Sequence, residues 1–100
     1  NIGFMYHSVK DYKTSLKWFT LSAEQGYGGS MYWLGHQSEH GLAVLEDIVY
    51  AHMWYNIAAS SGNENASKNR DSVAKFMLPS DISAAQKLAE ECIRKKYKGC

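Results

Sequence analysis

The sequence has little proline, little cysteine and almost no net charge. Its 100 residues include one proline, two cysteines and a formal net charge of +1. A charge so near zero provides no broad basic face for nucleic acid, and no apolar run approaches the roughly 20 residues of a membrane-spanning helix. The sequence also lacks a G-x-S-x-G motif, a glycine-rich phosphate loop and a pair of catalytic carboxylates. We therefore expect no cofactor, no nucleic-acid partner and no membrane insertion.

The first residues carry no targeting signal. Residues 1–6 contain no initiator Met, no basic region and no apolar core of a signal peptide. We therefore expect the chain to be a fragment whose localisation signal lies in the missing part.

The scarcity of proline favours an all-helical chain. Helix-forming Ala, Leu, Lys, Glu and Gln lie between short glycine-containing breaks, and Val, Ile and Thr never alternate with polar residues long enough for a strand. The pattern predicts helices at 1–8, 11–25, 29–40, 47–61, 63–77 and 80–97. Helices of this length are marginal alone, so they must bury their apolar stripes against neighbours.

The sequence repeats with a period of 36 residues. A shift of 36 positions places Trp18 on Trp54, and it pairs Asp11 with Asp47 and Gly26 with Gly62. Phe19 meets Tyr55, Leu21 meets Ile57, and three serines meet alanines of similar size. The shared pattern predicts a helical hairpin in each period, with units of about 1–26 and 27–62 and a terminal capping unit at 63–100.

The repeated residues have a physical role in this hairpin. Ser15, Trp18 and Phe19 recur at three- and four-residue steps, so we expect them, with Trp54, on a packed helix face. The two paired aspartates lie where an N-cap accepts hydrogen bonds from free amides. The two paired glycines lie where a left-handed residue ends a helix.

These residues resemble the Sel-one-like repeat, a relative of the tetratricopeptide repeat. The matching positions are Leu34, Gly35, Gly41, Val44, Asp47, Ala51, Trp54, Tyr55, Ala58, Ala59, Gly62 and Ala66. The resemblance implies a right-handed α-solenoid of stacked antiparallel helix hairpins, and the last third of the chain is similar to the closing helices of many bacterial members. It also implies a non-enzymatic scaffold or adaptor, often exported in bacteria.

Three positions depart from the family pattern. Ala43 stands at the second loop glycine, where a side chain disfavours the usual backbone. Arg70 and Asp71 replace a Leu-Gly pair, as expected of a terminal unit that faces water. Leu78 precedes Pro79 where Ser or Thr would cap the last helix, so we expect capping to pass to Ser80 or Asp81.

The histidines invite a metal interpretation. His36, Glu39 and His40 spell the H-x-x-E-H signature of inverted zinc peptidases, and the two histidines share a helix face. A zinc site needs a further ligand and a larger catalytic fold. We therefore interpret both histidines as polar surface positions and assign no metal site. His52 aligns with Leu16, so we expect it at a boundary between helices with one nitrogen bonded.

The two cysteines are expected to pair. A continuous helix would place Cys92 and Cys100 about 12 Å apart, too far for a disulfide. Gly99 and the polar tail before it allow the chain to turn back. We predict a Cys92–Cys100 disulfide, which implies an oxidising compartment and a periplasmic or secreted location. Two free thiols are the alternative.

The first helix of each hairpin is the predicted binding face for a peptide or protein. We expect Trp33, His36, His40 and Asn69 to be exposed there. Tyr32 and Trp33 cannot both lie on the packing face, so their rings serve inter-repeat packing or peptide binding.

Two other functions remain open. Some cysteine-rich relatives are associated with β-lactam binding, which makes a weak β-lactam-binding or hydrolytic activity conceivable. Those relatives carry a cysteine pair in each repeat and this chain does not, and a chromogenic β-lactam assay separates the two cases. The chain could instead be a structural C-terminal cap only. Its exposed N-terminal helix would then favour self-association.

Overall fold

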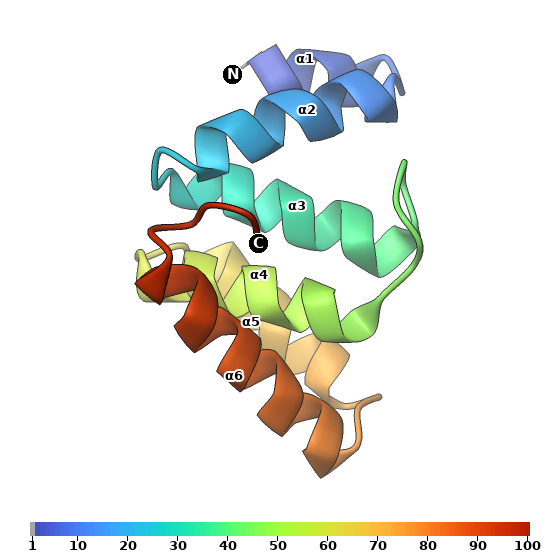
Figure 1. Ribbon diagram of the computed structural model, residues 1–100. Coiled ribbons are helices and arrows are strands. Elements are labelled where there is room, and N and C mark those ends of the chain that lie inside the picture. Colours follow the sequence, from blue (N-terminus) through green and yellow to red (C-terminus); the bar gives the residue numbers. More distant parts are fainter. Residues whose placement is uncertain (1) are drawn as a thin grey trace.

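The computed structural model describes residues 2–100 as an elongated stack of helices, about 35 × 26 × 23 Å (Figure 1). The helices are α1 (Ile2–Ser8), α2 (Tyr12–Ala23), α3 (Gly28–His40), α4 (Ile48–Ser60), α5 (Glu64–Ala74) and α6 (Pro79–Arg94). Residues 2–100 contain no strand. Every expected helix is present with ends within three residues of the prediction, except that Asn1 lies outside the described residues. The all-α fold class is therefore confirmed.

The helices pack mainly on their neighbours in sequence. α1 contacts α2, α2 contacts α3, α3 contacts α4, and α4 contacts both α5 and α6. Figure 1 shows the resulting order, from α1 and α2 at one end of the stack to α5 and α6 at the other. Stacked hairpins with mostly local contacts are the architecture of an α-solenoid.

The predicted helix ends are confirmed at both repeats. The carboxylates of Asp11 and Asp47 accept hydrogen bonds from first-turn amides of α2 and α4. Gly26 and Gly62 have φ values of 89° and 95°, in the left-handed region. A Cβ is unfavourable there, so glycine suits both helix ends.

The departures from the family pattern are accommodated locally. Ala43 adopts the left-handed backbone of the glycine it replaces, with φ of 64°. At the start of α6, the Asp81 carboxylate accepts a hydrogen bond from the Leu78 amide at 3.2 Å, and Pro79 takes the first helical position. Asp71 is exposed, as expected of a terminal unit.

In each of the first two hairpins, a glycine of the first helix packs directly against an aromatic ring of the second helix. A Cβ at Gly3 would lie 2.6 Å from the Phe19 ring, and one at Gly35 would lie 2.7 Å from the Tyr55 ring. Both rings are fully buried. The absence of a side chain on the first helix therefore lets the second helix insert a whole ring beside its backbone.

The two repeated tryptophans differ in exposure. Trp54 is 8% exposed, but Trp18 is 37% exposed, so the expectation that both are core residues was wrong for Trp18. Their neighbours Ile57 and Leu21 differ in the same way, at 1% and 46%. The physical reason is position, because α4 packs against α3, α5 and α6, whereas the main contacts of α2 are with α1 and α3.

The C-terminal tail turns back onto the stack. Lys96, Tyr97 and Gly99 have positive φ values, and Cys92 and Cys100 form a disulfide with their Cα atoms 5.6 Å apart. A Cβ at Gly26 would lie 3.5 Å from the Tyr97 ring. The tail therefore reaches from α6 to the turn between α2 and α3.

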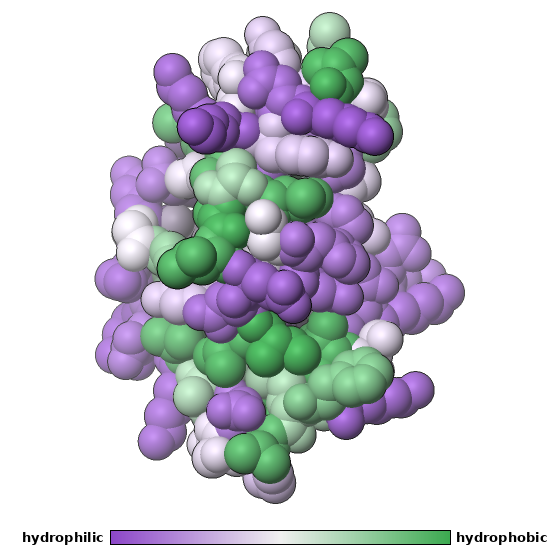
Figure 2. Space-filling view, turned by 90° about the vertical axis from the view of Figure 1, so that its right-hand side faces the viewer, coloured by the Kyte–Doolittle hydropathy of each residue, from purple (hydrophilic) through white to green (hydrophobic). Residues whose placement is uncertain are grey.

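Several connections carry exposed apolar side chains. Val9, Leu45, Phe76 and Leu78 are between 66% and 91% exposed. They belong to the connections α1–α2, α3–α4 and α5–α6, which share one edge of the stack in Figure 1. Figure 2 faces that edge and shows hydrophobic patches separated by hydrophilic side chains. None of the helices within residues 2–100 has the length and apolar character needed to cross a membrane.

The contact between Gly35 and Tyr55 predicts the effect of one methyl group. We expect Gly35→Ala to lower the free energy of unfolding by about 2 kcal/mol, because the new Cβ overlaps a buried ring. The matched control is Gly29→Ala in the same helix, where a Cβ meets no atom within 4 Å. Urea denaturation should show this control unchanged or stabilised by up to about 1 kcal/mol. Equal stability of the two variants would contradict the close contact.

The disulfide predicts a second stability change. We expect Cys100→Ser to lower the free energy of unfolding by about 2 to 3 kcal/mol, because a short covalent loop no longer restricts the unfolded chain. Denaturation with and without a reductant measures the effect. The reductant should destabilise the wild type and leave Cys100→Ser unchanged. A wild type insensitive to reductant would refute the prediction.

Candidate protein-interaction surface

Five aromatic rings from α1 and α3 form a contiguous row, which we call the ring row. Its members are Phe4, His7, Trp33, His36 and His40. The α3 members recur at three- and four-residue steps, which places them on one side of the helix. The α1 members join them because α1 lies alongside the same part of the stack.

Trp33 is the centre of the ring row. Its ring centroid lies 4.5 Å from that of His7 and 5.4 Å from those of Phe4 and His36. It also stacks on the buried Phe19 ring at 5.9 Å with an interplanar angle of 8°. Trp33 is therefore half-buried, which corrects the expectation that it is exposed. The same ring joins the core of the first hairpin to the surface of the second.

The histidines of the ring row contact one another. The His36 ring lies 5.4 Å from the His7 ring and 4.6 Å from the His40 ring, measured between centroids. His36 is half-buried and His40 is exposed, so the predicted exposure holds only for His40. Nε2 of His7 is buried and has no hydrogen-bond partner within residues 2–100.

These surroundings favour neutral imidazoles. Burial lowers the pKa of His36, and the neighbouring His40 and His7 lower it further, against a smaller opposing effect of Glu39. Burial also lowers the pKa of His7. At neutral pH the His7 and His36 rings are therefore uncharged, and a neutral imidazole can both donate and accept hydrogen bonds.

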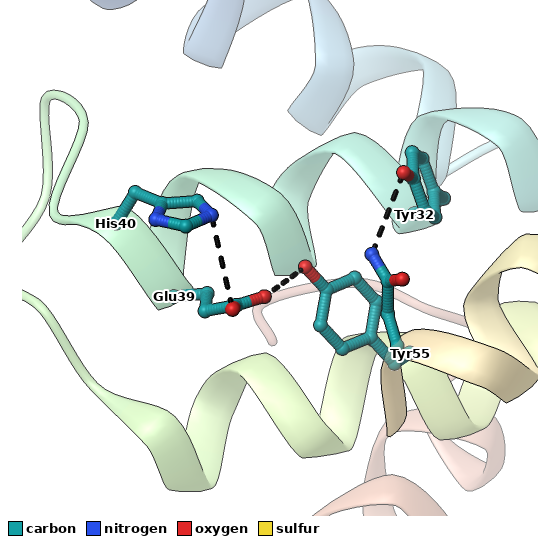
Figure 3. A network of polar contacts seen from close by, with 5 residues as sticks. Tyr32, Glu39, His40 and Tyr55 are labelled. Atoms are coloured by element: carbon teal, nitrogen blue, oxygen red, sulfur yellow. Dashed lines mark hydrogen bonds and ion pairs between the residues drawn. The ribbon is translucent and has the colours of Figure 1, made fainter. Parts of the chain in front are cut away.

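Asn69 lies apart from the ring row. Its side-chain amide donates to the hydroxyl of Tyr32 at 3.4 Å, which ties α5 to α3 (Figure 3). Asn69 is half-buried, so its expected exposure is also corrected. The Tyr32 ring lies 5.8 Å from that of Tyr55, whose hydroxyl donates to Glu39 at 2.7 Å. Tyr32 and Asn69 therefore serve packing between repeats.

The hydrogen bond from Tyr55 holds the carboxylate of Glu39 in place beside the ring row. Burial raises the pKa of Tyr55, and its hydrogen bond to Glu39 raises it further, so the phenol remains protonated as a donor. The other carboxylate oxygen of Glu39 lies 3.8 Å from Nε2 of His40 (Figure 3). No three potential metal ligands converge anywhere in residues 2–100. The H-x-x-E-H sequence therefore contributes two rings to the surface and the acceptor of a partly buried hydrogen bond.

His52 lies on the second helix of its hairpin and away from this surface. It is 3% exposed, as expected for a boundary between helices. The expected hydrogen bond to a ring nitrogen is not made at Nδ1, which is buried without a partner within the described chain. Burial lowers its pKa, and the positive charge of Arg70 lowers it further.

Sequence reasoning missed Phe4 and His7. A constant shift of 36 residues fails for the first helices because the loop after Gly3 is four residues shorter than the loop after Gly35. Aligning the two glycines instead places Phe4 on His36 and predicts that both occupy the same face. The glycine spacing therefore held a signal for Phe4 but not for His7, which this alignment pairs with Glu39.

The lowered pKa values predict acid sensitivity. The ordinary histidine pKa is 6.5, and the folded values of His7 and His36 lie below it. The unfolded chain therefore binds more protons, so the free energy of unfolding should fall as the pH drops through and below about 6.5. Denaturation between about pH 7.5 and about pH 5 measures this slope.

The variant His7→Gln/His36→Gln should show a smaller pH slope than the wild type. A residual slope is expected, because the pKa of the buried His52 is also lowered. Identical slopes in the two proteins would contradict the assignment.

Comparison with known proteins identifies a family of repeat proteins. A family model described as Sel1 repeat matches residues 3–27 and 29–63, which together make up more than half of the chain. A search among curated proteins found no match. The two matched segments contain every residue of the ring row.

Proposed function

Because the chain belongs to the Sel1 repeat family, we propose that it is a non-enzymatic scaffold or adaptor that binds a peptide or protein through the ring row. Sel1 repeat proteins generally mediate protein–protein interactions, and the family is typically non-catalytic. The ring row is the observation that carries the proposal.

The chemistry of the ring row suits a peptide. Phe4 is 47% exposed and His40 has a half-exposed side chain, so both can be covered by a partner. Trp33 between them is held by Phe19, so binding would order few new side chains. Aromatic rings supply apolar contact area, and imidazole nitrogens supply hydrogen bonds to a peptide backbone. The proposed ligand is an extended peptide with apolar side chains and no requirement for a particular charge.

The disulfide supports a location for this activity. Disulfides persist in oxidising compartments, and Cys92 and Cys100 are paired. We propose that the protein acts in the periplasm or outside the cell.

A selected peptide tests the proposed function. Peptides are selected from a random library on the wild-type chain and then titrated against Phe4→Ala/His40→Ala. We expect a loss of affinity of about tenfold or more, which corresponds to about 1.4 kcal/mol. Trp33→Ala is unsuitable because the half-buried ring contributes to stability.

The matched control is Ile93→Ala on α6, which removes an apolar side chain that is 46% exposed, against 47% for Phe4. Its affinity should equal that of the wild type. Equal affinity of the ring-row variant and the control would refute the ring row as the binding surface.

A further inference from the structure

Three histidines of the ring row contact one another from ring to ring. The His36 ring is the middle one, and it lies 5.4 Å from the His7 ring of α1 and 4.6 Å from the His40 ring, measured between centroids. When one of these imidazoles takes up a proton, its neighbour can do so only against the repulsion of the first charge. Both histidines beside His36 lower its pKa in this way.

The inner end of this group has no carboxylate in contact with it. Nε2 of His7 is buried without a hydrogen-bond partner within residues 2–100, and the ring that packs on His7 from α2 is the Tyr12 phenol, at 5.3 Å. Neither of the ion pairs within the described residues includes His7 or His36. A proton on either ring would therefore add a charge that has no partner of opposite sign in contact.

The nearby carboxylates lie at the outer end of the group, beside His40. Glu39 has one oxygen 3.8 Å from Nε2 of His40, and its other oxygen accepts the hydrogen bond of the Tyr55 hydroxyl from α4. Glu46, from the connection before α4, lines the same hollow as Glu39 and His40, and the two α5 side chains in that lining carry no charge. Glu39 raises the pKa of His36, but burial lowers it by more.

An apolar peptide on the ring row would make a charge on these rings less favourable still. It would exclude water from His7 and His36 and bring no negative charge, and desolvation disfavours the charged form of an imidazole. A protonated imidazole also has no acceptor nitrogen left for a peptide amide. The free chain therefore binds protons more readily than the complex does, so the affinity must fall as the pH decreases.

We propose that the ring row is an acid-sensitive binding site, which holds an apolar peptide at neutral pH and releases it in acid through protonation of His7 and His36. This inference rests on the proposed function, because it concerns the same surface and the same class of peptide. It adds that the chain makes the interaction depend on pH by itself, without any titratable group in the partner.

A peptide without ionisable side chains tests the proposal. Peptides with blocked ends are selected at about pH 7.5 from a library that contains no charged residue and no histidine, and weaker binding to Phe4→Ala/His40→Ala identifies one that occupies the ring row. Fluorescence anisotropy then gives its dissociation constant at about pH 7.5 and about pH 5. We expect the dissociation constant to rise at least about tenfold at the lower pH, because the rings must lose protons before the peptide binds.

Two variants assign this pH dependence to residues. His7→Gln/His36→Gln cannot take up these protons, so the ratio of its two dissociation constants should be at least about threefold smaller than the wild-type ratio, whatever its affinity at neutral pH. The matched control is His52→Gln, which removes a buried histidine away from the ring row. It should keep the wild-type ratio.

Calorimetry gives a measurement that needs no variant. Binding is measured at about pH 6 in two buffers with different ionisation enthalpies, and the difference in heat gives the number of protons exchanged. We expect the wild-type chain to release protons when the peptide binds. Circular dichroism verifies that each protein is folded at the pH values used.

Three outcomes would overturn the proposal. The first is an affinity that is equal at the two pH values or higher in acid. The second is binding at about pH 6 without release of protons. The third is the wild-type ratio in a folded His7→Gln/His36→Gln. In all three cases a peptide still binds the ring row, so the proposed function stands. If instead no selected peptide depends on Phe4 and His40, the proposed function is refuted and the acid-sensitive site with it.

Discussion

The close contact between a glycine on one helix and an aromatic ring on the next determines the geometry of the first two hairpins. Gly3 and Gly35 leave room for the rings of Phe19 and Tyr55, and both rings are fully buried. A single methyl group at either glycine would occupy space that the ring already fills. Because this contact fixes how near the two helices lie, it also fixes which side chains of the first helix remain at the surface.

The candidate binding surface follows from that constraint. Trp33 rests on Phe19, the ring that Gly3 admits, so the ring row has a rigid base inside the first hairpin.

The far end of the stack is closed by different means. Asp71 stands in place of the hairpin glycine and is exposed. Instead, the disulfide between Cys92 and Cys100 holds the tail against α6, and Tyr97 reaches the turn after α2. The tail thus links the last unit to the first across the stack, and contacts distant in sequence stabilise an otherwise local architecture.

The sequence by itself determined the helices, their caps and the repeat, because these depend on neighbouring residues. Asp47 caps α4 and Gly62 ends it through interactions within a few positions of the chain. Only the tertiary structure decided the burial of Trp33, the exposure of Trp18 and the meeting of His7 with His36. These depend on where each helix lies in the stack and on loops of unequal length, which shift the register of the first helices relative to the second. A side chain's exposure is set by all the helices around it, and a periodic pattern specifies only the helix to which it belongs.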